Sequence, residues 1–153
     1  MQPKSADQVL DFAIVEEERA AKFYRSLAKR VSRPPMREVF ETFAKEEDAH
    51  KAKLLGVRAG QAELIPDAKV SDLGLADELP DEPRDPSGEV DYRQALVIAI
   101  KAETAAYDLY SCLAAATKNA TWKLVLEGLA AEEAKHRARF EAEFAGWQPW
   151  MGW

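Results

Sequence analysis

The sequence predicts an all-α protein, a single four-helix bundle built from two copies of a helix hairpin. Apolar side chains recur at alternating spacings of three and four in four segments, which is typical of amphipathic helices. Residues 13–28 match 99–114 at a shift of 86 positions, and the same shift aligns 43–54 with 129–140 without a gap. A repeat unit this long that occurs only twice does not fit a solenoid, so a duplicated hairpin is the simpler account.

The first hairpin occupies the N-terminal third of the chain. The stretch "SADQ" (5–8) reads as a capping box for the first helix, and the prolines of "SRPPM" (32–36) suit the first turn of the second. The apolar stripes of these two helices are Leu10, Ile14, Glu17, Ala21, Tyr24, Ala28 and Val31, then Phe40, Phe43, Glu47, His50, Leu54 and Val57.

The second hairpin follows a segment rich in Pro, Asp and Gly (58–89), which we interpret as a crossover along the bundle. "DYRQ" (91–94) reads as a second capping box, and Asn119 can cap the fourth helix. Short loops near 32–35 and 117–120 make each hairpin antiparallel. The stripes are Leu96, Ile100, Glu103, Tyr107, Tyr110 and Ala114, then Trp122, Leu126, Leu129, Glu133, His136 and Phe140.

Length and composition limit the domain count and the partners. The 153 residues suit one domain, which we assign to 1–146, with a Trp-rich tail at 147–153. The net charge of −6 argues against nucleic acid or an anionic membrane as partner and favours cations. The single cysteine excludes a disulfide within the chain, and no segment approaches the ~20 apolar residues of a membrane span. With no signal-peptide pattern, we expect a cytoplasmic protein.

Each stripe is interrupted by charged or imidazole side chains at one turn. Residues three apart on a helix share a face, so each Glu-x-x-His pair presents a carboxylate and an imidazole to one point. The interrupting residues are Glu17, Glu47, His50, Glu103, Glu133 and His136, which include both histidines of the protein.

Four buried carboxylates need compensation, because one uncompensated buried ion costs several kcal/mol. Two divalent cations, or two ferric ions with an oxide dianion, would cancel the charge. This favours a redox pair over a single ion without separating iron from manganese. The alternative is a salt-bridged polar layer in a plain bundle. Four adjoining acids point about 100° away and are predicted to be solvated: Glu16, Glu18, Glu46 and Glu132.

The motifs "AIVEEERAAKFY", "FAKEEDAHKAKLL", "AIKAETAAYDLY" and "LAAEEAKHRARFEAEF" resemble those of the rubrerythrin-type members of the ferritin-like di-iron superfamily. The resemblance extends to about residue 145 and implies a ferritin-like bundle that holds two iron ions, with manganese or zinc as alternatives. It implies Glu17 and Glu103 as ligands from the leading helices, Glu47 and Glu133 as bridges, and His50 and His136 as ligands to one metal each.

The resemblance also suggests that Tyr24 and Tyr110 donate hydrogen bonds to ligand carboxylates; core packing is the alternative reading. Two features depart from the family. Cys112 alone cannot supply the four ligands of a rubredoxin-like iron site, so electrons are expected from a separate donor protein. The family's extra glutamate on the third helix is also missing, since Ile100 and Ala106 flank Glu103 at a spacing of three.

These observations predict an oxidoreductase of peroxidase or ferroxidase type that reacts with hydrogen peroxide or oxygen, and a homodimer. Two alternatives remain open at this point. One is binding, oxidation and transfer of ferrous iron, and the other is a structural or regulatory bundle that holds zinc or manganese.

The tail "GWQPWMGW" (146–153) contains three tryptophans in its last seven residues. We expect the rings to cover a bundle end or a subunit interface; a docking peptide is the alternative.

Overall fold

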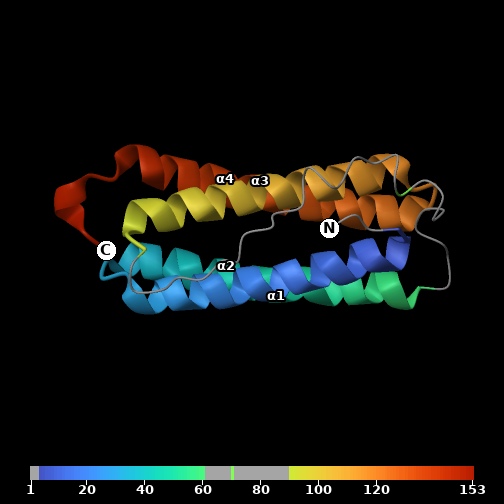
Figure 1. Ribbon diagram of the computed structural model, residues 1–153, viewed down its shortest axis with the longest axis horizontal. Helices are drawn as coiled ribbons and strands as arrows, with labels where there is room; N and C mark the ends of the chain where they lie inside the picture. The colour runs from blue at the N-terminus through green and yellow to red at the C-terminus, as the bar shows by residue number, and fades with distance from the viewer. Residues whose placement is uncertain (1–3, 61–69, 71–89) are drawn as a thin grey trace.

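A computed structural model describes residues 4–60, 70 and 90–153. Within these ranges the chain forms four long helices and one short 3-10 helix (Figure 1). The long helices are α1 (Ala6–Arg30), α2 (Pro34–Ala59), α3 (Tyr92–Ala116) and α4 (Ala120–Gly146), and the 3-10 helix is η4 (Pro149–Met151). The predicted all-α four-helix bundle is confirmed. The predicted crossover (58–89) lies outside the described residues except at its first three positions and at Val70.

The helix starts follow the predicted capping chemistry, with one difference. Asp91 Oδ1 accepts from the backbone N–H of Gln94 at 2.7 Å, and the Gln94 side chain accepts in return from Asp91 at 2.9 Å. At α1 only half of the box forms, because Gln8 Oε1 accepts from the backbone N–H of Lys4 instead of Ser5. Asn119 caps α4 as predicted, through the N–H of Trp122.

The two hairpins pack tightly within themselves and loosely against each other. α1 lies along α2 and α3 lies along α4 over their whole lengths, whereas backbone approaches between the hairpins are few (Figure 1). Long side chains therefore fill the space between the hairpins. This spacing leaves room for carboxylates and imidazoles at mid-length, where closer helices would admit only small residues.

Two apolar clusters lie on either side of that mid-length layer. One is mainly aliphatic and includes Leu10, Leu54 and Leu126. The other is largely aromatic and includes Phe23, Phe40, Tyr92 and Phe140. They enclose the polar layer in a water-poor interior, which strengthens the electrostatic interactions within it.

One stripe position on α3 differs from the prediction. Tyr107 is 39% exposed, while Leu109 is 4% exposed.

The C-terminal tail folds over the aromatic end of the bundle. The rings of Trp147 and Trp153 lie 5.9 and 5.4 Å from the ring of Tyr92, and the Arg30 guanidinium lies 3.7 Å above the Trp153 ring. The backbone N–H of Ser32 donates to the Trp153 carbonyl at 3.3 Å. Two of the three rings therefore cover a bundle end, as predicted, whereas Trp150 is 84% exposed.

None of the helices in the described part of the chain combines the length and the apolar character needed to cross a membrane.

Candidate metal centre

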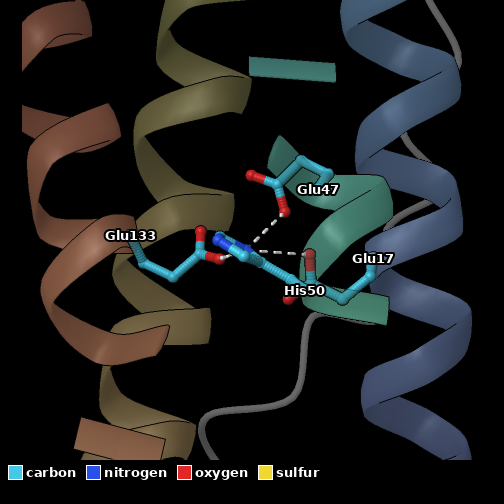
Figure 2. A group of neighbouring side chains, drawn as sticks. All are labelled: Glu17, Glu47, His50 and Glu133. Carbon is cyan, nitrogen blue, oxygen red and sulfur yellow. Dashed lines mark ion pairs between the residues drawn. The ribbon is translucent and has the colours of Figure 1, made fainter. Parts of the chain in front are cut away.

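The six side chains singled out from the sequence converge at the middle of the bundle. One comes from α1, two from α2, one from α3 and two from α4, and each is at most 3% exposed: Glu17, Glu47, His50, Glu103, Glu133 and His136. Figure 2 shows the group formed by Glu17, Glu47, His50 and Glu133, whose polar ends point toward one another. The two hairpins thus contribute equally to one buried polar layer.

These residues form two overlapping groups, each of three carboxylates and one imidazole. The first consists of Glu17, Glu47, His50 and Glu133, and the second of Glu47, Glu103, Glu133 and His136. In each group one candidate ligand atom per residue lies within 4.8 Å of the others. Glu47 and Glu133 belong to both groups, so we call the groups the Glu17 half-site and the Glu103 half-site.

In the Glu17 half-site, the Nδ1 atom of His50 faces the carboxylates. It lies 2.6 Å from Glu133 Oε1, 3.4 Å from Glu47 Oε2 and 3.5 Å from Glu17 Oε2. His50 Nδ1 and Glu133 Oε1 nevertheless make no hydrogen bond of acceptable geometry. Two polar atoms that face one another in this way, without a well-formed hydrogen bond, suit ligands of a common cation.

In the Glu103 half-site, His136 Nδ1 lies 2.9 Å from Glu47 Oε1, 3.5 Å from Glu103 Oε1 and 3.9 Å from Glu133 Oε2. Each shared carboxylate therefore turns one oxygen to each half-site: Glu47 uses Oε2 and Oε1, and Glu133 uses Oε1 and Oε2. This division of oxygens is the geometry of a bridging carboxylate.

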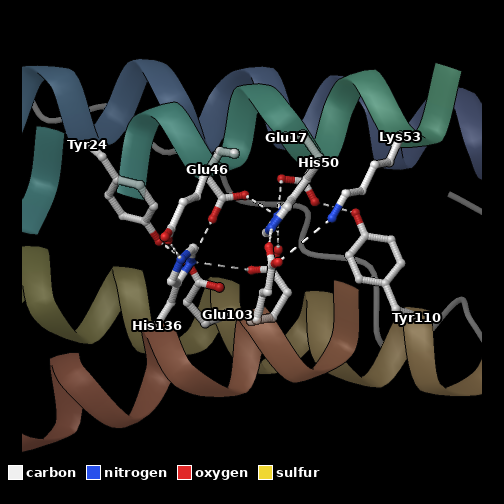
Figure 3. A network of polar contacts seen from close by, with 11 residues as sticks. Glu17, Tyr24, Glu46, His50, Lys53, Glu103, Tyr110 and His136 are labelled. Carbon is white, nitrogen blue, oxygen red and sulfur yellow. Dashed lines mark hydrogen bonds and ion pairs between the residues drawn. The ribbon is translucent and has the colours of Figure 1, made fainter. Parts of the chain in front are cut away.

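The outer nitrogen of each imidazole contacts a carboxylate from the other hairpin. His136 Nε2 lies 2.5 Å from Glu46 Oε2 (Figure 3). His50 Nε2 contacts Glu132 Oε2 in the same way. A carboxylate on Nε2 holds the proton there and leaves Nδ1 as the lone-pair donor.

Glu46 and Glu132 are solvated as predicted, with side chains 44% and 39% exposed, but they also reach across to the histidines, which the prediction did not include. Glu16 pairs with Arg19 at 3.0 Å and is only 12% exposed, so it is more enclosed than predicted. Glu18, paired with Lys51 at 2.5 Å, is solvated as predicted and makes no contact with the histidines that the structure records. The sequence did hold one signal for the contacts of Glu46 and Glu132 with the histidines, because the two glutamates occupy equivalent positions of the repeat.

Tyr24 and Tyr110 are hydrogen-bond donors to carboxylates of the centre. Tyr24 donates to Glu103 Oε1 and Tyr110 donates to Glu17 Oε1, so each tyrosine crosses to the opposite hairpin (Figure 3). We expected each tyrosine to donate to a ligand carboxylate, but not to one in the other hairpin. These bonds fix one oxygen of each glutamate, while Oε2 of Glu17 and Oε2 of Glu103 are buried without a hydrogen-bond partner.

Without a cation, the carboxylates raise one another's proton affinity. Burial and the charge of Glu47 raise the pKa of Glu17, and burial with the charges of Glu103, Glu47 and Glu17 raises the pKa of Glu133. Burial opposes the ionisation of Glu47 as well, but hydrogen bonds with Glu17 and the histidines hold its pKa below the usual range.

The imidazoles respond to the same negative surroundings. Burial works against a charged His136, yet hydrogen bonds to Glu103 and Glu47 raise its pKa to about 10. Burial likewise opposes charge on His50, but Glu133, Glu17 and Glu47 raise its pKa further still. The centre thus retains protons at neutral pH, and a bound cation would replace them.

The donor set fits a pair of divalent or trivalent metal ions. Each half-site offers three carboxylates and one imidazole nitrogen, a set that suits iron or manganese. Oε2 of Glu17, Oε2 of Glu103, Oε1 of Glu133 and Nδ1 of His50 are the buried atoms of the centre that lack hydrogen-bond partners. Metal ions would supply those partners and cancel the carboxylate charge.

The comparisons with known proteins agree with this centre. The family model "Rubrerythrin" matches residues 8–72 and 94–149, which together span most of the chain. The chain belongs to the rubrerythrin family. A family of ferritin-like di-iron domains and a buried Glu/His cluster together indicate a di-metal site.

A solved structure of a hypothetical protein from Pyrococcus furiosus is similar to the chain. It has 25% sequence identity and a TM-score of 0.68, and the match covers 90% of this chain and 86% of that one. No curated protein matches the chain significantly.

Proposed function

We propose that this member of the rubrerythrin family is an oxidoreductase whose two iron ions react with hydrogen peroxide or dioxygen. The observation that supports this most is the split of the Glu47 and Glu133 oxygens between the two half-sites. Two ions that share these carboxylates would lie close enough to act on one small molecule together. When bound, the iron pair supplies Lewis acidity and electrons.

The chain's own residues hold this chemistry in place. Tyr24 and Tyr110 keep Glu103 and Glu17 oriented, and Glu46 and Glu132 keep the histidines in the tautomer that leaves Nδ1 free. The two apolar clusters exclude bulk water from both ends. A rigid, dry surrounding of this kind lowers the reorganisation needed during reaction.

The reaction balances with an external donor. Hydrogen peroxide takes up two electrons and two protons, its O–O bond breaks, and two water molecules result. A separate electron-transfer protein of the cytoplasm is oxidised in this step. This electron-transfer protein docks on the surface of the bundle.

Iron handling is the competing function, and the opening between α2 and α4 bears on it. Its lining includes Glu46 and Glu132 but also Lys135 and Arg139. The formal charges of these four side chains cancel, so this opening has no acidic funnel of the kind that concentrates cations. The opening between α2 and α4 therefore gives no support to an iron carrier, and the oxidoreductase remains our proposal.

The test is anaerobic loading with ferrous ion, followed by rapid mixing with hydrogen peroxide or with oxygen. We expect two ions per chain, fast oxidation followed by the near-ultraviolet absorption of ferric protein, and repeated turnover once a reductant is added. The variant Glu133→Ala is the control without a shared carboxylate. Absence of oxidation by either oxidant would contradict the proposal, and release of ferric product beyond two ions per chain would favour iron handling.

A further inference from the structure

A cavity between α1 and α3 leads to the carboxylates from the side opposite the outer histidine contacts. It is narrow, with about 20 Å³ open to the centre of a water-sized molecule. Its floor consists of the four glutamates of the two half-sites, and half-buried Glu16 and Ala105 belong to its outer part. The buried Oε2 atoms of Glu17 and Glu103, which lack hydrogen-bond partners, belong to residues of this floor.

The walls of the cavity are made mostly of small apolar side chains. Phe12 and Leu109 contribute the larger apolar side chains. The small ones are five alanines: Ala13, Ala20, Ala102, Ala105 and Ala106. Ala20 and Ala106 follow Glu17 and Glu103 by three residues, so each lies one turn beyond a floor glutamate on the same helix face. The two positions are equivalent in the repeat, and a larger side chain at either would extend into the cavity.

The opening between α2 and α4 is different in chemistry. Phe43 stacks on His136 with ring centroids 4.0 Å apart, and Glu46 and Glu132 are engaged with the imidazoles. A molecule that enters from this side meets these contacts before it meets the carboxylates. The cavity between α1 and α3 reaches the carboxylates without disturbing such contacts.

The alanine walls discriminate by charge and by size. Between Glu16 in the outer part and the glutamates of the floor, the alanine walls offer a hydrated cation no replacement ligands, so losing its water shell there is costly. A small uncharged molecule loses little on the same path. Glu17 and Glu103 of the floor each accept a tyrosine hydrogen bond at Oε1, so only their Oε2 atoms remain for a ligand.

We propose that the small uncharged oxidant reaches the centre through this alanine-lined passage between α1 and α3, and that Ala20 and Ala106 set its width. This inference rests on the proposed function, because it assigns the route of that oxidant. Dioxygen and hydrogen peroxide share the required size and neutrality. Ala20 and Ala106 act as specificity-determining residues that touch the oxidant and bind no metal.

The first experiment uses xenon as an uncharged probe and needs no catalysis. Crystals of the protein pressurised with xenon are expected to show a xenon atom in the passage, and crystals of Ala106→Leu are expected to lack it. Ala115→Leu, an exposed position on the same helix, is the matched control and should retain xenon. Absence of xenon from the wild-type passage, or its retention in Ala106→Leu, would overturn the inference.

The second experiment measures the rate constants of ferrous protein with dioxygen and with hydrogen peroxide in separate runs. Ala106→Leu should slow the reaction by about tenfold or more, because filling the passage obstructs access. Metal stoichiometry and affinity should stay the same as in Ala115→Leu. Slowing with only one oxidant identifies that oxidant as the user of the passage.

Two outcomes separate the inference from the proposed function. If no oxidant reacts with wild-type protein but xenon behaves as described, the function fails and the passage stands. If the oxidants react equally fast in Ala106→Leu and wild type, the passage fails and the function stands. Slower ferrous loading in Ala106→Leu would assign the passage to cations and overturn the inference. Should Ala106→Leu misfold, Ala106→Val and Ala20→Val carry the same tests with a smaller side chain.

Discussion

The two half-sites have equivalent candidate ligands but unequal neighbours. Glu17 and His50 correspond to Glu103 and His136 in the repeat, and the tyrosines and outer carboxylates are exchanged between hairpins in the same way. The difference lies in packing: Phe43 stacks on His136, whereas the equivalent position in the other hairpin is Leu129, buried in the aliphatic cluster.

The repeat therefore gives the two half-sites the same charges and donor types. The apolar side chains packed around them differ between the two hairpins. The glutamates around the two histidines also act unequally, because they raise the pKa of His136 to about 10 and that of His50 more. The two metal ions are therefore expected to differ in affinity even though their ligands match.

The largest expected effect comes from removing a shared carboxylate. Glu133→Ala should reduce binding from two metal ions to none, because both half-sites lose a ligand. Glu103→Ala should leave the Glu17 half-site able to bind one ion. Anaerobic titration followed by metal analysis measures this, and equal loss in the two variants would contradict the division into half-sites.

The second effect is the pH dependence of metal binding. The folded, metal-free protein keeps a proton on His136 up to a pKa of about 10, above the ordinary value of 6.5, so this proton stabilises the metal-free fold below 6.5 and the stabilisation is lost as pH rises toward 10. Metal binding must displace that proton. Affinity should therefore rise by about tenfold per pH unit for each proton displaced.

Calorimetric unfolding with and without manganous ion, between about pH 6.5 and 8.5, measures the prediction as a growing metal-induced stabilisation. Glu133→Ala serves as the control, in which added metal should leave the unfolding temperature unchanged at every pH. A metal-induced shift in the native protein that stays constant with pH would contradict the displacement of protons.

A smaller effect is expected from residues that orient the ligands. Tyr110→Phe should weaken one metal by about 10- to 100-fold, because Glu17 loses its hydrogen bond. Tyr24→Phe should do the same to the metal at Glu103. Competition titration with a coloured chelator resolves the two affinities, and identical weakening of both metals by either variant would contradict the crossed pairing.

The smallest effect should follow Phe43→Leu, which gives the Glu103 half-site the neighbour found at the equivalent position. Loss of the stacked ring should lower the free energy of unfolding by about 0.5–1.5 kcal/mol in metal-free protein. It should also bring the two metal affinities closer together. Urea unfolding and the same competition titration measure both, and an unchanged difference in affinity would show that the aromatic neighbour is not its cause.

The sequence was sufficient to predict the helices and the buried positions of the six candidate ligands, because both depend on local periodicity. The three-and-four spacing places Glu47 and His50 on one face, and the gap-free duplication repeats this at Glu133 and His136. The convergence of the six residues depends on little more than the antiparallel pairing of two equal hairpins.

Other parts of the centre were not predictable from spacing. Glu46 and Glu132 lie about 100° from the ligand face of their own helices, and a helical projection therefore assigns them to solvent. They reach the histidines because the opposing hairpin presents His136 and His50 at the right height. For the same reason, the sequence could not show that Tyr24 would serve Glu103 instead of Glu17.

The sequence by itself therefore determined the repeat, the four helices and the chemical identity of the buried layer, since these follow from side-chain type and helical period. Only the tertiary structure decided which carboxylate oxygen faces which histidine, which tyrosine holds which glutamate, and that the alanines between α1 and α3 enclose a cavity. The physical reason is that the rotation and offset of one hairpin against the other depend on the packing of many side chains at once, whereas periodicity specifies only the face of a single helix.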